Sequence, residues 1–179
     1  VGNGGVGQGI RESDIPVPGA VRGAVMVEAL RWRHREWRVE GRRHLVLWLN
    51  ALVVPYTRQT RGTRWRADRR GEAVRAYNAS QGALRDVVRL FMSSEGVEAF
   101  PARPLGLAAT FWVAPPRRVG TIDLSNLEKA CEDALQGVLI PNDRWVWERA
   151  DPGPCRHGAK RLGGEDAVEV HVWEVEPTC

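Results

Sequence analysis

The stretch TIDLSNLEKACEDALQGVLIPND, residues 121–143, decides how the rest of the chain is interpreted. Ser125 followed three residues later by Glu128 forms the S-x-x-E pattern of a capping box, so we predict that Ser125 is the N-cap of a helix. Gly137 is expected to end this helix. Apolar residues recur at helical spacing and predict one buried face; they are Leu127, Ala130, Cys131, Ala134, Leu135 and Val138.

The polar residues of this stretch predict a second, separate face on the same helix. Asn126, Lys129 and Asp133 are three and four positions apart, which places them on one side. Asp123 precedes the helix and Asp143 follows it. Two interpretations stay open from the residues alone. The two aspartates converge on a metal ion beside Lys129, or they cap turns while Lys129 pairs with Asp133.

These residues carry a resemblance to a known family. The stretch resembles the RusA-type Holliday junction resolvases, whose signature reads approximately D-x-D-N-x-x-K, then D-A-L, then D-D. The resemblance extends from about residue 45 to residue 179. Ser125 stands where the signature has its second aspartate, and Asn142 replaces the first aspartate of the D-D pair. The matching residues are Asp123, Asn126, Lys129, the triplet Asp133, Ala134 and Leu135, and the pair Asn142 and Asp143.

The resemblance implies an endodeoxyribonuclease that uses Mg²⁺, or alternatively Mn²⁺, to resolve four-way DNA junctions as a homodimer. Its implied catalytic residues are Asp123, Lys129 and Asp143, with the two aspartates as metal ligands. Ser125, Asn126 and Asn142 have supporting roles. One alternative is a junction-binding protein that lost catalysis through its changes at residues 125 and 142. A more distant one is an arginine-rich DNA-binding module without nuclease ancestry.

Charge is distributed unevenly along the chain. Residues 1–120 contain 20 basic and 10 acidic residues, whereas residues 121–179 contain 6 basic and 12 acidic residues. This division is typical of a DNA-binding surface beside a carboxylate site, although a solvated charged surface explains it equally well. Arginines with Thr and Gly between them predict a phosphate-contacting loop within residues 58–75. The expected DNA-binding residues are Arg58, Arg61, Arg64, Arg66, Arg69, Arg70, Arg117 and Arg118.

The first 44 residues are predicted to lie outside the nuclease domain, which is expected to comprise residues 45–179. Residues 1–25 are rich in Gly, Val and Pro and show no periodicity, which predicts disorder. Residues 27–43 carry six arginines together with Trp32 and Trp37. They form either a basic arm that grips DNA or a surface element whose tryptophans cover the edge of the core. Their broken alternation leaves the secondary structure open.

The nuclease domain is predicted to be a mixed α/β fold, with about four strands and two main helices packed on the sheet. Strands are expected near residues 44–54, 105–113, 144–149 and 167–175, and a packing helix over residues 71–91. Residues 93–104 are expected to form a loop. The last strand alternates strictly and is therefore expected to be half-exposed, with His171 at the surface.

Several other kinds of site and location are disfavoured by the sequence. The three cysteines are scattered and form no C-x-x-C pair, which favours a reducing compartment over a disulfide framework. Cys155 and His157 lack two further ligands at the spacing of a zinc site. No apolar run approaches membrane-spanning length. We therefore expect a cytoplasmic protein, and the family resemblance implies that it is encoded by a bacterium or a phage.

Overall fold

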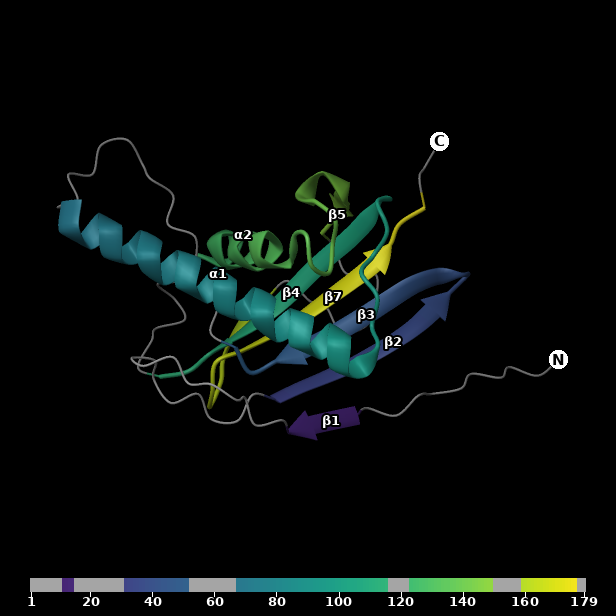
Figure 1. The fold of residues 1–179 in the computed structure, drawn as a ribbon, viewed down its shortest axis with the longest axis horizontal. Helices are drawn as coiled ribbons and strands as arrows, with labels where there is room; N and C mark the ends of the chain where they lie inside the picture. The colour runs from purple at the N-terminus through teal and green to yellow at the C-terminus, as the bar shows by residue number, and fades with distance from the viewer. Residues whose placement is uncertain (1–10, 15–30, 52–66, 116–122, 150–158, 177–179) are drawn as a thin grey trace.

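The computed structural model describes residues 11–14, 31–51, 67–115, 123–149 and 159–176. These residues form a mixed sheet with helices α1 (Ala67–Glu95) and α2 (Leu124–Leu135) on one of its faces (Figure 1). The described part of the sheet has seven strands: β1 (Arg11–Asp14), β2 (Arg31–Val39), β3 (Arg42–Leu49), β4 (Leu105–Val113), β5 (Val146–Glu148), β6 (Ala159–Leu162) and β7 (Ala167–Glu174). The predicted mixed α/β class with two packed helices is confirmed, whereas the sheet has more strands than the four or so expected.

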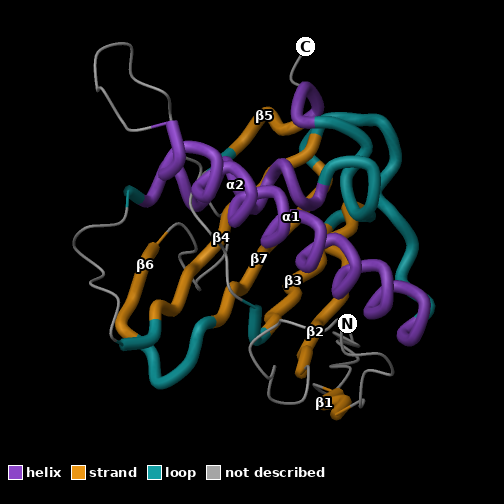
Figure 2. Tube along the Cα trace, turned by 60° about the vertical axis from the view of Figure 1, so that its left-hand side comes forward, coloured by secondary structure: helices purple, strands orange, loops and turns teal. Residues whose placement is uncertain are grey.

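The sheet is antiparallel through most of its width and parallel at one edge. Its order is β1-β2-β3-β7-β4, with antiparallel pairing throughout. The outer edge of β4 pairs in parallel with β5 at one end and with β6 at the other. Figure 2 shows β6 beside β4 and both helices in front of the sheet. The strand expected near residues 144–149 is reduced to β5, because residues 143–145 form a one-turn 3-10 helix.

The face of the sheet beneath the helices forms the core. Every second residue of the central strands points into it: Leu45, Leu47 and Leu49 from β3, Leu105, Leu107 and Phe111 from β4, and Val168, Val170 and Val172 from β7. From α1 they meet Leu84, Val88 and Phe91, and from α2 Leu127, Ala130 and Cys131. All of these side chains are at most 2% exposed. At about 1.5–3 kcal/mol for each large apolar side chain, this layer stabilises the position of α2 on the sheet.

The prediction of a half-exposed last strand was wrong. β7 lies between β3 and β4, and seven of its eight residues are buried. His171 is therefore buried as well, at 2% exposure. Its Nε2 lies 3.2 Å from Nδ1 of His44, and its ring packs against Trp37 and Trp173. The alternation correctly separated the core-facing residues of β7 from the residues on its other face. On that other face, Trp37 and Trp173 pack against His171 and bury it.

The arginine-rich segment that precedes residue 45 belongs to the sheet. β2 pairs with β3 along its whole length, from Trp32 opposite Leu49 to Val39 opposite Arg42. Trp32 is fully buried, and its ring meets Phe91 edge-on at 6.4 Å between centroids. The sheet thus begins well before the expected boundary at residue 45. Residues 11–14 form β1 against β2, so the predicted disorder does not hold there; the rest of residues 1–30 lies outside the described residues.

Helix α1 is longer at both ends than the predicted 71–91. It begins at Ala67, so Arg69 and Arg70 belong to a helix rather than to the expected loop, and it continues to Glu95, into the expected loop 93–104. The other expected DNA-binding residues lie outside the described residues: Arg58, Arg61, Arg64, Arg66, Arg117 and Arg118. Neither α1 nor α2 combines the length and the apolar character that a membrane crossing requires.

Candidate active site

Helix α2 is capped at its start by Asp123. Its Oδ1 accepts hydrogen bonds from the backbone N–H of Ser125 at 3.0 Å and from the Ser125 hydroxyl at 2.9 Å. The prediction that Ser125 is the N-cap was therefore wrong by two residues. Asp caps a helix as well as Ser does, and its negative charge is favourable at the positive end of the helix dipole. The cap fixes the first acidic residue of the motif at the beginning of α2.

The chain reverses after α2 through a tight turn. Gly137 has φ +71°, a conformation that glycine adopts without the strain a side chain would bring. Its N–H donates to the carbonyl of Ile140 at 2.8 Å. Leu139 and Ile140 are buried in the core and hold the turn against the sheet. The predicted stop at Gly137 is confirmed, and the turn leads the chain back past α2.

The reversed segment brings the second acidic residue of the motif beside the helix. Asn142 caps the 3-10 turn Asp143–Trp145, because its Oδ1 accepts the backbone N–H of Arg144 at 3.0 Å. Asp143 is the first residue of that turn, and its side chain is 44% exposed. The predicted supporting residue Asn142 thus orients the backbone around Asp143.

Lys129 contacts acidic residues both on α2 and in the turn that follows it. Its Nζ lies 2.6 Å from Oδ1 of Asp133, one turn later on α2, and 3.6 Å from Oδ2 of Asp143. The pKa of Lys129 is raised, mainly by its hydrogen bond to Asp133; burial, the next-largest effect, lowers it, and the negative charges of Asp133, Glu132 and Asp143 raise it further. The side chain is therefore cationic at neutral pH. Its pairing with Asp133 is the contact expected if the aspartates only cap turns, whereas its contact with Asp143 is one that the sequence did not predict.

Asp133 is held in turn by helix α1. The hydroxyl of Tyr77 donates to Asp133 Oδ2 at 2.7 Å, and Arg85 donates to the backbone carbonyl of Asp133 at the same distance. One turn earlier, Gln81 donates to the carbonyl of Ala130 at 2.6 Å. Tyr77 lies within the helix that the sequence predicted over residues 71–91 only as a packing element. A tyrosine on a packing face still needs a partner for its hydroxyl, which is the signal that would have revealed this link.

We expect Tyr77→Phe to lower the free energy of unfolding by about 1.5 kcal/mol, because it removes a hydrogen bond to a charged group. Urea unfolding of the purified proteins measures this difference. Asp86→Ala is the matched control, since it removes an ion pair on α1 whose side chains are 62% and 76% exposed. Its effect should stay within about 0.5 kcal/mol. Equal effects of the two changes would show that the Tyr77 hydroxyl does not anchor Asp133.

Further acidic residues lie along α2. Glu132 is buried and pairs with Arg149 at 2.8 Å. The pKa of Glu128 is raised, mainly by burial and also by the charges of Glu132 and Asp123, although Arg149 lowers it. Burial raises the pKa of the Cys131 thiol to about 12, so this thiol stays protonated and is a packing residue rather than a nucleophile. Of the acidic residues of α2, Glu132 and Asp133 are the ones whose charges raise the pKa of Lys129.

The donor atoms at the two ends of α2 suit a hard cation. Asp123, Ser125, Asn142 and Asp143 offer carboxylate, hydroxyl and amide oxygens, and all four side chains are exposed or half-exposed. Mg²⁺ prefers such oxygens and retains several waters, so two carboxylates suffice to bind it. Within the described ranges, three or more His, Cys, Asp or Glu residues do not gather into a metal-binding cluster. A metal shared by Asp123 and Asp143 stays a prediction.

By their contacts, the site residues form two groups. Lys129, Asp133 and Asp143 are in mutual contact through the lysine. Asp123 and Ser125 form a second group at the start of α2, and Asn126, half-buried, follows them on the first turn of the helix. A search of curated proteins finds no match to this chain. The family model of endodeoxyribonuclease RusA matches residues 56–172, a span that contains both helices and all the residues of these two groups. Since the match covers most of the sequence, the chain belongs to the RusA endodeoxyribonuclease family.

Proposed function

We propose that the protein is a Mg²⁺-dependent endodeoxyribonuclease that resolves four-way DNA junctions during recombination and repair. Membership of the RusA family supports a nuclease that acts on branched DNA. The observation that carries the proposal is the position of Lys129, whose ammonium group is held between Asp133 on α2 and Asp143 in the turn that follows α2. A cation set among exposed carboxylates suits the chemistry of a phosphodiester, whose oxygens gain negative charge during cleavage.

The residues are assigned roles according to their contacts. We assign Asp123 and Asp143 to metal binding; when bound, Mg²⁺ or Mn²⁺ supplies a nucleophilic water and neutralises charge on the phosphate. Lys129 is 43% exposed, so its ammonium group is accessible to the scissile phosphate. Asp133 fixes the direction of that ammonium group, and Asn142 orients the turn that carries Asp143.

DNA binding and symmetry complete the proposal. We assign contact with the DNA backbone to the arginines of residues 58–70, together with Arg117 and Arg118, because phosphate contacts of this kind supply most of the affinity for DNA. We further propose a homodimer, because resolution of a two-fold symmetric junction requires two matched cuts. The activity is assigned to the cytoplasm of a bacterial host, because its DNA substrate is found there.

The test compares a synthetic four-way junction with a linear duplex of the same sequence, each with and without Mg²⁺. The expected result is cleavage of the junction at symmetric positions only when Mg²⁺ is present, with the duplex left intact. Titration with Mn²⁺ instead of Mg²⁺ should restore cleavage. Equal cutting of both substrates, or cutting unaffected by a chelator, would contradict the proposal.

A binding-only function is the second candidate, and two contacts favour it. The Ser125 hydroxyl donates to Asp123, at a position where the family signature carries another aspartate. Asn142, where the signature carries an aspartate, uses its amide oxygen to cap the turn that begins at Asp143. Compared with the signature, the site therefore lacks two negative charges. Under this candidate the protein binds junctions tightly and cleaves none of them, with or without a metal.

Ser125→Asp separates the two candidates. Residue 125 lies in the first turn of α2, where a negative charge is favourable, and this gain offsets repulsion from Asp123, so stability should change by less than about 1 kcal/mol. We expect the added carboxylate to tighten Mg²⁺ binding, seen as a larger rise of Tm with Mg²⁺, and to increase junction cleavage. Ser125→Asn is the control of similar size without the charge. An unchanged Mg²⁺ response in Ser125→Asp would mean that residue 125 is not part of the metal site.

A further inference from the structure

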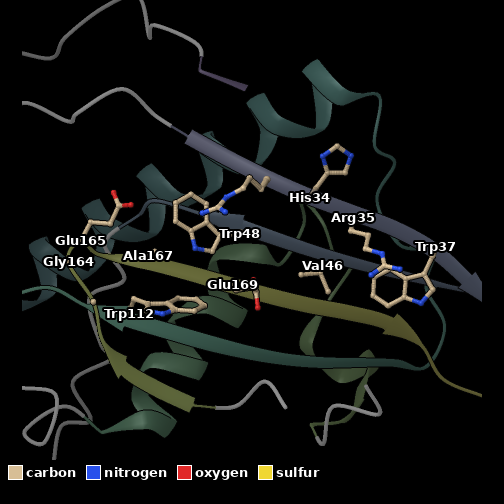
Figure 3. A pocket seen from close by; sticks show the side chains of 12 residues that line it. His34, Arg35, Trp37, Val46, Trp48, Trp112, Gly164, Glu165, Ala167 and Glu169 are labelled. Carbon is tan, nitrogen blue, oxygen red and sulfur yellow. The ribbon is translucent and has the colours of Figure 1, made fainter. Parts of the chain in front are cut away.

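The face of the sheet that points away from α1 and α2 carries tryptophans and arginines side by side. Arg33 on β2 is opposite Trp48 on β3, and Trp48 is opposite Glu169 on β7. Trp112 lies on the next strand, β4, opposite Ala167 of β7. Figure 3 shows Trp48 and Trp112 on one side of the sheet, with the helices behind it. We call Arg33, Arg35, Trp48 and Trp112 the Trp-Arg face.

This face is hollowed rather than flat. A cavity of about 530 Å³ lies over it, lined by the four residues of the Trp-Arg face and by the turn before β7. That turn contributes Gly163, where an added Cβ would come within 2.9 Å of Cβ of Trp112. A side chain at residue 163 would therefore crowd Trp112. The volume falls within the range of pockets that hold small organic ligands, which includes the size of a nucleotide.

The basic and acidic side chains that line the cavity lie on different sides of it. On the β2 side, the Arg33 guanidinium lies 4.4 Å from the Trp48 ring, and Arg35 lies 5.1 Å from the ring of Trp37. Arg33 and Arg35 are exposed, so each combines a positive charge with an aromatic surface. The other side contains Glu165 and Glu169. Glu165 is itself paired with Arg31 of β2 at 2.6 Å, so the positive charge of the cavity lies along β2. A polyanion is therefore attracted to the β2 side, and the tryptophan rings of the face favour contact with an aromatic base.

We infer that the Trp-Arg face binds an unpaired, single-stranded segment of DNA. Its phosphates lie beside Arg33 and Arg35, and its bases stack on Trp48 and Trp112. Sheets that bind single strands combine aromatic side chains for stacking with basic residues for the backbone, and this face has both. A single strand of DNA carries both the anionic phosphates that the arginines attract and the aromatic bases that stack on the tryptophans. The face lies on the opposite side of the sheet from α2, so this binding is separate from the proposed site of cleavage.

The test measures binding of a fluorescein-labelled single-stranded oligo(dT) by anisotropy in the absence of metal. Wild-type protein should bind it, and Trp48→Ala and Trp112→Ala should each weaken binding about tenfold, the loss expected for one stacked base. Trp147→Ala is the matched control, because Trp147 is 57% exposed and does not line the cavity. It should bind like wild type. Arg33→Ala combined with Arg35→Ala should lower the log–log salt slope by about 0.7 for each phosphate that the variant no longer neutralises.

Each result supports or overturns the inference. Because the arginine pair is exposed, its variant reports on the face even if a tryptophan variant fails to fold. Wild-type affinity for oligo(dT) and an unchanged salt slope in the arginine variant would overturn it. Light scattering gives a second way to overturn it. If the arginine variant lost self-association but still bound the single strand, the face would be assigned to a second copy of this chain. Junction cleavage is assayed in parallel, so single-strand binding without cleavage would refute only the nuclease proposal.

Discussion

Lys129→Ala is expected to abolish junction cleavage while leaving junction binding almost unchanged. The lysine is one cation in a chain with 24 arginines, so it adds little to the affinity for DNA. Its position is unusual, however, because its ammonium group contacts two carboxylates, those of Asp133 and Asp143. Removal of a charge aimed at a reacting oxygen typically lowers kcat by about 10²–10³-fold. Single-turnover cleavage and gel-shift binding of the same junction measure the two effects.

The control for Lys129→Ala is Lys160→Ala on β6, which removes the second of the two lysines in the chain. We expect it to cleave normally. Because its partners raise the pKa of Lys129, deprotonation of this residue should not reduce cleavage below about pH 10, the ordinary range of a lysine. Loss of junction binding with normal turnover in Lys129→Ala would show that the residue binds DNA rather than assisting the reaction.

Gly106→Ala should produce the largest loss of stability. A Cβ at this position would lie 1.9 Å from Cε2 of Trp173, 2.1 Å from Cζ2 and 2.4 Å from Nε1. The ring has little freedom to move, because Trp173 is 2% exposed, packs on His171 and donates its Nε1 hydrogen to Glu148 at 3.2 Å. Overpacking of a close-packed interior costs about 3 kcal/mol in severe cases. We expect at least this loss, measured by urea unfolding.

Gly82→Ala is the control with the same chemical change in an open position. Gly82 lies within α1, and an added Cβ meets no atom within 4 Å. Alanine is the better helix former, so this variant should gain about 1 kcal/mol. The two substitutions are thus predicted to have opposite signs. If Gly106→Ala unfolds at the same urea concentration as wild type, the indole of Trp173 has an alternative position that the packing does not reveal.

The sequence by itself determined the elements whose pattern is local. The apolar run of residues 105–113 became β4 with the same bounds, and the helical spacing of residues 127–135 became the buried face of α2. Gly137 ended that helix as expected, because a positive φ suits the one residue without a side chain. The spacing of Lys129 and Asp133 also fixed their contact, since residues four apart on a helix are neighbours. Family membership followed from the same local motif.

Only the tertiary structure decided which residues are buried despite a surface-like sequence pattern. It also decided which residues that are distant in the sequence come into contact. β2 is a strand because it pairs with β3, although its own alternation is broken. His171 is buried because β7 lies between two strands whose neighbours cover its polar face, and no pattern within one strand records its place in the sheet. Tyr77 and Asp133 are 56 residues apart, and Asp143 reaches Lys129 only through the turn after α2. Such contacts depend on how helices and strands pack, a property of the whole chain rather than of any single stretch.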